Sequence, residues 1–162
     1  MIVFDSSTLI LLAKVEILDI FLREYKEKII IPKAVEEEAT IKETFDGLLI
    51  KKRIEEKRIE IKNVDKEKVE NIKKDFKLGK GEAEAIILTE QQKCLLATDD
   101  RNAILACKIK NIQFTTAIDF VVRASEKKKI GKEEAKRKID QLEKLGRYKK
   151  EIIDGAREKI GE

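Results

Sequence analysis

Short apolar runs recur along this chain and predict the strands of a parallel sheet. Four runs rich in β-branched side chains cover residues 1–4, 28–31, 94–98 and 111–115. Because these runs lack polar alternation, we expect both faces of each strand to be buried, as in parallel sheets. Residues 58–62 instead alternate polar and apolar side chains, which is typical of an edge strand with one wet face.

Between the runs, apolar residues return at the three- and four-residue spacing of amphipathic helices. This alternation of strands and helices predicts an α/β sandwich. After residue 115 only helices are expected, with Gly131 and Gly146 as helix stops and a hairpin formed by the last two helices. Pro32 fits the first position of a helix. The predicted helices cover residues 6–15, 16–25, 32–57, 65–77, 79–92, 100–110, 116–128, 132–144 and 148–160.

The composition narrows the class of protein. The chain has 162 residues, which suits one domain, and 42% of them are charged, 36 basic and 32 acidic. A mixed-sign surface with net charge +4 favours a polyanionic partner only weakly, and the Lys and Glu content is typical of a thermophile. No stretch approaches the roughly 20 apolar residues of a membrane span, and residues 1–13 lack secretory features, so we expect a cytoplasmic protein. Cys94 and Cys107 are expected to be reduced, buried thiols.

Three aspartates follow predicted strands. Asp5 comes after the first run, and Asp99 and Asp100 come after the run at 94–98. In open α/β sheets ligands bind at the carboxyl ends of strands. Asp5 could alternatively be an ordinary helix cap, and one of Asp99 and Asp100 could cap the next helix while the other points into the crevice. Adjacent carboxylates repel unless a cation or proton lies between them, which favours a site at Asp99 and Asp100.

Two helices are predicted to carry glutamates toward the protein interior. Glu38 lies three residues after Val35, on the apolar stripe of its helix. Glu82 precedes Ala85 at helical spacing, whereas Glu84 shares its face with Ile87 and Leu88. The periodicity leaves the choice between Glu82 and Glu84 open.

Clustered carboxylates favour a hard divalent cation such as Mg²⁺ or Mn²⁺. Such a cation lowers the pKa of bound water and neutralises charge on a phosphate, so phosphodiester hydrolysis suits the cluster best. The chain has no histidine to act as general base, so a carboxylate would take the proton of the metal-activated water.

These residues resemble the motifs of PIN-domain ribonucleases, the superfamily that includes VapC toxins, and of a poorly characterised prokaryotic branch of it. The resemblance spans nearly the whole chain. It rests on Asp5 and Ser7, on Glu38 after the 31–32 Ile-Pro pair, on Gly-Glu-Ala-Glu-Ala-Ile at 81–86, and on Thr-Asp-Asp at 98–100.

The resemblance implies a PIN-like three-layer sandwich with a five-stranded parallel sheet of order 3-2-1-4-5. It implies a nuclease domain over residues 1–128 and a C-terminal helical hairpin over 129–162. Glu82 takes a place that is more often aspartate, and a register shift of one would exchange Asp99 and Asp100. The catalytic acids implied are Asp5, Glu38, Glu82 and Asp100, with Asp5, Glu82, Asp99 and Asp100 as metal ligands, Ser7 and Thr98 as their polar supports, and Arg101 near the substrate.

The leading hypothesis is therefore a Mg²⁺- or Mn²⁺-dependent endoribonuclease that acts on RNA. The resemblance extends this hypothesis to the toxin of a toxin-antitoxin pair, with a small antitoxin and a second copy of itself as partners. A phosphoaspartyl phosphatase would need an acid where Ser7 stands. A receiver domain would need its acidic pair after the first strand. The remaining alternative is a non-catalytic RNA-binding or interaction module with the same fold, for which Glu82 is the only hint.

Overall fold

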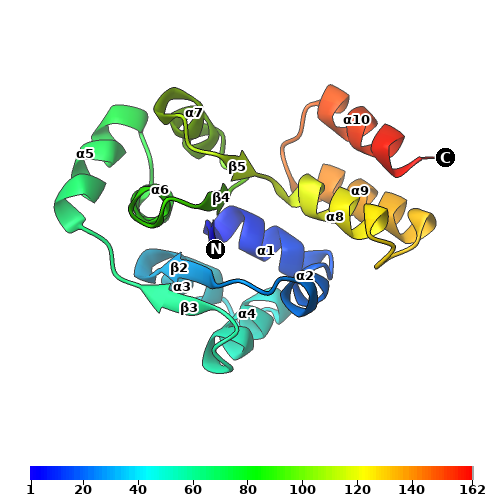
Figure 1. Cartoon of the computed structure of the whole chain (residues 1–162), viewed down its shortest axis with the longest axis horizontal. Coiled ribbons are helices and arrows are strands. Elements are labelled where there is room, and N and C mark those ends of the chain that lie inside the picture. Colours follow the sequence, from blue (N-terminus) through cyan, green and yellow to red (C-terminus); the bar gives the residue numbers. More distant parts are fainter. Residues whose placement is uncertain (162) are drawn as a thin grey trace.

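Five parallel strands form one sheet in the order β3-β2-β1-β4-β5 in the computed structural model, which describes residues 1–161 (Figure 1). The predicted α/β fold and strand order are confirmed. The strands are β1 (Ile2–Phe4), β2 (Ile29–Pro32), β3 (Glu60–Lys62), β4 (Leu95–Ala97) and β5 (Phe114–Thr115). The helices are α1 (Ser6–Lys14), α2 (Leu18–Glu24), α3 (Lys33–Thr40), α4 (Phe45–Glu55), α5 (Lys66–Phe76), α6 (Lys80–Gln92), α7 (Arg101–Lys110), α8 (Ala117–Glu126), α9 (Lys132–Leu145) and α10 (Lys150–Ile160).

Burial along the strands explains why their sequences read as continuous apolar runs. Every residue of β1 and β2 is buried, and successive side chains of a strand point to opposite faces. Both faces of the sheet centre are therefore covered by helices. The outer strand β3 has two exposed residues, Glu60 and Lys62, as predicted for an edge.

The strand register places the ends of β1 and β4 side by side. Phe4 pairs with Ala97, and the amide of the next residue, Asp5, donates to the Ala97 carbonyl at 2.9 Å. Ala97 in turn pairs with Thr115 of β5. Helices α1, α7 and α8 all begin just beyond these paired residues. Their N-termini therefore gather at the carboxyl edge of the sheet.

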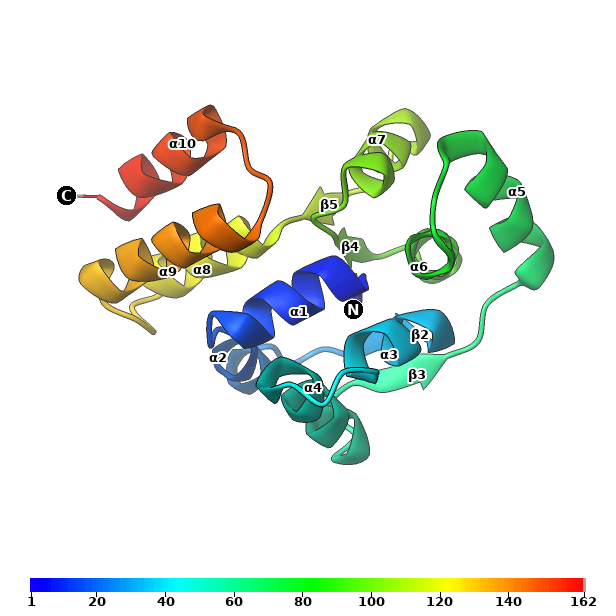
Figure 2. The same cartoon turned by 180° about the vertical axis from the view of Figure 1, so that it is seen from behind.

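Helices α9 and α10, called the C-terminal hairpin below, pack on each other and on α8. Figures 1 and 2 place these three helices at the end of the molecule opposite α5. Lys138 of α9 is buried and donates to the carbonyl of Val15, the C-cap of α1, at 2.6 Å. The hairpin is thus attached to the sheet domain by a polar contact as well as by apolar packing. None of the helices described in residues 1–161 is long and apolar enough to cross a membrane.

Three details of the helix predictions are wrong. The helix predicted over 32–57 is two helices, α3 and α4, and the loop between them packs against Gly47, where a Cβ would lie 2.3 Å from the Lys42 carbonyl oxygen. Pro32 ends β2 and caps α3 instead of occupying the first helical position. Gly131 begins α9 as its N-cap, whereas α8 has already ended at Glu126.

Candidate active site

Asp5 is fully buried at the end of β1 and caps α1. Its carboxylate accepts hydrogen bonds from the Ser6 amide at 2.7 Å, the Ser7 hydroxyl at 3.0 Å and the Thr98 hydroxyl at 2.8 Å. The pKa of Asp5 is raised to about 7, chiefly by burial and also by the charge of Glu82, against the lowering effect of these hydrogen bonds. The two interpretations of Asp5, helix cap and site carboxylate, are therefore compatible.

Glu38 reaches the same edge from α3. The prediction that it lies on an inward stripe is wrong, since its side chain is exposed. Its carboxylate nevertheless accepts from the Ser6 hydroxyl at 2.8 Å and from the Gly81 amide at 3.1 Å. A Cβ on Gly81 would lie 2.4 Å from Glu38 Oε2, so glycine is required for this approach to the N-terminus of α6.

Glu82 and Glu84 lie on different sides of α6. Glu82 is half-buried, and burial together with the charges of Asp100 and Glu38 raises its pKa. Glu84 is buried and accepts a hydrogen bond from the Ala34 amide, in the first turn of α3, at 3.2 Å. The structure thus places Glu82 among the acids and uses Glu84 to cap a neighbouring helix.

Asp100 caps α7 and faces the acidic group. Its Oδ2 accepts from the Ala103 amide at 2.9 Å, and its own amide donates to the Thr98 hydroxyl at 3.2 Å. Its charge raises the pKa of Glu82. Arg101, the first residue of α7, is exposed beside it.

Asp99 is held by a separate set of donors. Its carboxylate accepts from the Thr8 hydroxyl at 2.6 Å, from the Ala117 amide at 3.0 Å and from the Tyr148 hydroxyl. Its amide donates to Ser7 Oγ at 3.0 Å. Burial raises the pKa of Asp99, and the three donors oppose that shift. Neighbouring aspartates therefore lie in different environments.

Thr98 and Ser7 connect Asp5 to this strand end. Thr98 is buried; it donates to Asp5 and accepts from the Asp100 amide. Ser7 donates to Asp5 and accepts from the Asp99 amide. Both hydroxyls orient the Asp5 carboxylate. Sequence reasoning missed Thr8 and Tyr148, because nothing in the local pattern links either residue to Asp99.

The donor set fits a hard divalent cation in its chemistry. Asp5, Glu38, Glu82 and Asp100 supply carboxylate oxygens, and charge repulsion among them raises the pKa of Asp5 and of Glu82. As the side chains stand, no three metal-binding residues within residues 1–161 converge on one point. Their oxygens are instead held by helix N-termini and hydroxyls.

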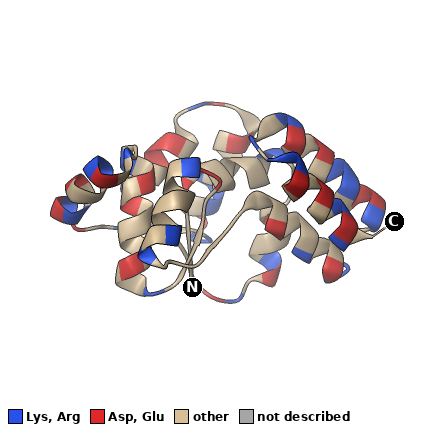
Figure 3. Ribbon diagram, turned by 90° about the horizontal axis from the view of Figure 1, so that it is seen from above, with Lys and Arg blue, Asp and Glu red and all other residues tan. Residues whose placement is uncertain are grey.

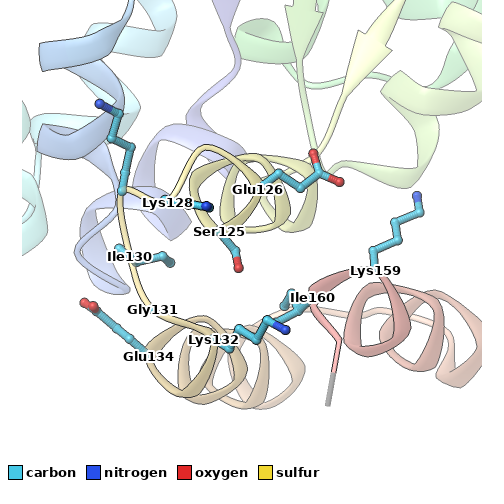
Figure 4. Close-up of a pocket in the computed structure, with 10 residues that line it drawn as sticks. Ser125, Glu126, Lys128, Ile130, Gly131, Lys132, Glu134, Lys159 and Ile160 are labelled. Atoms are coloured by element: carbon cyan, nitrogen blue, oxygen red, sulfur yellow. The ribbon is translucent and has the colours of Figure 1, made fainter.

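A separate cavity of about 510 Å³ lies between the end of α8 and the C-terminal hairpin (Figure 4). It is lined by charges of both signs, among them Lys128, Lys132 and Glu126. It lies at the end of α8 opposite Ala117, which contacts Asp99, and so is distinct from the acidic group. Figure 3 shows blue basic and red acidic segments interleaved along most helices, in agreement with a mixed-sign surface.

In open α/β folds ligands bind at the carboxyl edge of the parallel sheet, and carboxylates gathered there suit a hard cation. Over residues 1–162 the chain matches a family described as the PIN domain, and it belongs to that family. PIN domains are generally nucleases that use divalent metals, so the chain has a nuclease-type fold and the class of activity is hydrolysis. No curated protein matches the chain.

Proposed function

We propose that this protein is a divalent-metal-dependent endoribonuclease. The observation that carries the proposal is Asp5: a buried carboxylate whose donors Ser6, Ser7 and Thr98 are all neutral, and whose pKa is raised by burial and by Glu82. A buried charge without a cationic partner destabilises a fold, and a cation would provide the missing compensation. Asp5 also caps α1, so in this proposal it serves both the fold and the cation site.

In this proposal Asp5, Glu82 and Asp100 hold the cation, and Glu38 completes the acidic rim. The bound Mg²⁺ or Mn²⁺ would supply Lewis-acid activation of water and neutralise charge on the scissile phosphate. Ser7 and Thr98 keep the Asp5 carboxylate oriented through their hydrogen bonds to Oδ2. A carboxylate of the acidic rim would take the proton of the attacking water, because the chain has no histidine to do so.

RNA is the proposed substrate on the strength of the family. Arg101, exposed at the first turn of α7 next to Asp100, is the base that we propose contacts an RNA phosphate. We also propose that residues 1–128 form the nuclease domain and residues 129–162 its C-terminal helical hairpin.

A role as the toxin of a toxin-antitoxin pair, with an antitoxin and a second copy as partners, is a further proposal. Its support is an exposed apolar cluster on consecutive elements, Ile41, Phe45 and Leu48, which are 77%, 68% and 53% exposed. Sedimentation of the wild-type protein and Phe45→Ser would test self-association, and a concentration-independent monomer would contradict the dimer.

The test of the proposed function is calorimetric titration of Mn²⁺ into the wild-type protein, Asp5→Asn and Asp100→Asn. We expect wild-type binding and a loss of affinity of at least about 100-fold in either variant. Asp75→Asn, on the exposed face of α5, is the matched control and should bind as the wild type does.

The wild-type protein and Asp75→Asn should cleave a labelled mixed-sequence RNA, whereas Asp5→Asn and Asp100→Asn should not. Cleavage should stop when the metal is chelated. RNA binding without cleavage or Mn²⁺ binding would instead favour the non-catalytic module. Cleavage by Asp5→Asn at the wild-type rate would overturn the assignment of the site.

A further inference from the structure

The segment between α9 and α10 contributes one side chain, Tyr148, to the hydrogen bonds of the acids at the carboxyl edge of the sheet among the described residues. Tyr148 is half-buried, and its hydroxyl donates to Asp99 Oδ1. The chain approaches Asp99 here from 49 residues further along the sequence. The C-terminal hairpin, which lies beside α8 in Figure 1, thereby reaches the carboxyl edge of the sheet.

Gly146 makes this approach possible. It ends α9 in an extended conformation, and a Cβ at this position would lie 2.4 Å from Cε2 of the Tyr148 ring. Any larger residue would force the ring to move. The placement of Tyr148 is therefore specified by the backbone at Gly146 as well as by the hydrogen bond to Asp99.

Asp99 connects this tyrosine to the site. Thr8 of α1 and the Ala117 amide of α8 bind the same carboxylate, so Asp99 joins three elements that are distant in sequence. The Asp99 amide donates to Ser7 Oγ, and Ser7 donates to Asp5 Oδ2. Two hydrogen bonds therefore separate Asp99 from the proposed cation ligand Asp5.

The donors on Asp99 also decide which way the two neighbouring aspartates face. With both oxygens of Asp99 occupied, the next residue, Asp100, points toward Glu82 and caps α7. Removal of the Tyr148 hydroxyl would leave Oδ1 with only the long 3.3 Å contact from the Ala117 amide. Thr8 and the Ala117 amide would still hold Oδ2, but Asp99, whose amide donates to Ser7, would lose one of its anchors.

We propose that Tyr148 is a positioning residue of the nuclease site, which fixes Asp99 and, through Ser7, the orientation of the proposed cation ligand Asp5. This inference rests on the proposed function. It makes the C-terminal hairpin a structural part of the site instead of an appendage. Tyr148 touches neither substrate nor cation and acts only through Asp99.

The test compares Tyr148→Phe with Tyr25→Phe, because the chain has only these two tyrosines and each variant loses a single hydroxyl. Tyr25 stacks on Phe21, beyond the end of α2. Each protein is titrated with Mn²⁺ by calorimetry, and its melting temperature is measured without metal. We expect Tyr148→Phe to weaken Mn²⁺ binding about tenfold or more, within the range seen when a support of a metal ligand is lost, and Tyr25→Phe to leave the affinity unchanged.

Two further variants identify the route of the effect. Gly146→Ala keeps the hydroxyl but displaces the ring, and it should weaken Mn²⁺ binding in the same direction. In an Asp99→Asn background, Tyr148→Phe should cause no additional loss of affinity, because the two residues act through one contact. If the losses of Mn²⁺ affinity caused by Tyr148→Phe and Asp99→Asn add up in the double variant, Tyr148 does not act through Asp99, and the inference is contradicted.

A lower melting temperature of Tyr148→Phe with wild-type Mn²⁺ affinity would show a purely structural role and overturn the inference. Absence of Mn²⁺ binding by the wild-type protein and by Tyr25→Phe alike would reject the proposed function, and this inference with it. Binding by those two proteins and equal binding by Tyr148→Phe would reject the inference alone.

Discussion

Charged side chains are arranged in opposite ways at the carboxyl edge of the sheet and in the C-terminal hairpin. At the edge, the charge of Glu82 raises the pKa of Asp5, and Asp100 and Glu38 do the same to Glu82. In the hairpin, Arg157 of α10 contacts Asp140 and Glu143 of α9 at 2.7 and 3.2 Å. Like charges are thus concentrated in one region and neutralised in the other.

This difference distinguishes the paired charges of the hairpin, which stabilise the fold, from the grouped acids of the sheet edge, which destabilise it. Acids grouped without a basic partner cost folding free energy, and such clusters are found where a ligand supplies the compensation. Paired charges across two helices contribute modestly to stability and need no ligand. Substitutions in the two regions should therefore change stability in opposite directions.

The largest effect on stability is expected for Asp5→Asn without metal. The pKa of Asp5 rises from 3.8 in the unfolded chain to about 7 in the folded protein. Below the lower value the carboxyl is protonated in both states, and above the higher value the folded protein must bury its charge. Asparagine removes that charge, so the gain in the free energy of unfolding should grow from pH 4 to pH 7 and level off at up to about 4 kcal/mol.

Urea unfolding of the wild type and Asp5→Asn at pH 4.5 and pH 8, with a chelator present, measures this gain. Asp75→Asn on α5 provides a control that lies away from the acidic edge. A stability difference that is the same at both pH values would contradict the claim that Asp5 is buried among like charges.

The strands were predictable because the sheet interior is buried on both faces, whereas their order came from the resemblance to PIN domains. All residues of β2 are buried, so no polar residue interrupts its apolar run. Exposed and partly buried residues alternate in β3 because it lies at the edge of the sheet. The break between α3 and α4 was not predicted, and it is accompanied by a close approach of the Lys42 carbonyl to Gly47 across a turn. The spacing of apolar residues along a helix gives no information about such a contact.

The candidate site could be predicted only as a set of acids. The position after a strand identified Asp5, and the resemblance identified Glu38, whose exposure contradicts its place on an apolar stripe. Asp99 and Asp100 have different tertiary partners: Tyr148, which lies far along the chain, donates to Asp99, whereas Asp100 caps α7. The roles of adjacent residues are set here by tertiary partners, and a one-residue shift in sequence carries no signal about them.

A smaller loss of stability is expected for Lys138→Met, which tests the contact between the hairpin and α1. The substitution keeps the length of the side chain but removes the donor to the Val15 carbonyl. A buried acceptor left without its partner costs about 1–3 kcal/mol, so the free energy of unfolding should fall by that amount. Lys136→Met is the matched control on the same helix, since Lys136 is half-buried and contacts only Glu133 at 3.7 Å among the ion pairs of the described residues.

Denaturant unfolding of both lysine variants at pH 7 would measure this difference. An unchanged or higher stability of Lys138→Met would mean that burial of the ammonium group costs as much as its hydrogen bond contributes. The hairpin would then be held on α1 by apolar packing alone.

The smallest effect is expected for Arg157→Gln, because its partners lie at the surface. Arg157 contacts Asp140 and Glu143 across the hairpin and Asp154 on its own helix at 3.7 Å, and its side chain is 38% exposed. Solvent screens such pairs, so the loss should be at most about 1 kcal/mol and should shrink in 1 M salt. Urea unfolding at low and high salt, with Lys159→Gln on the same helix as control, measures it. A loss of stability that salt does not reduce would mean that the aliphatic part of the Arg157 side chain packs between α9 and α10. Apolar packing, and not charge pairing, would then be what Arg157 contributes to the hairpin.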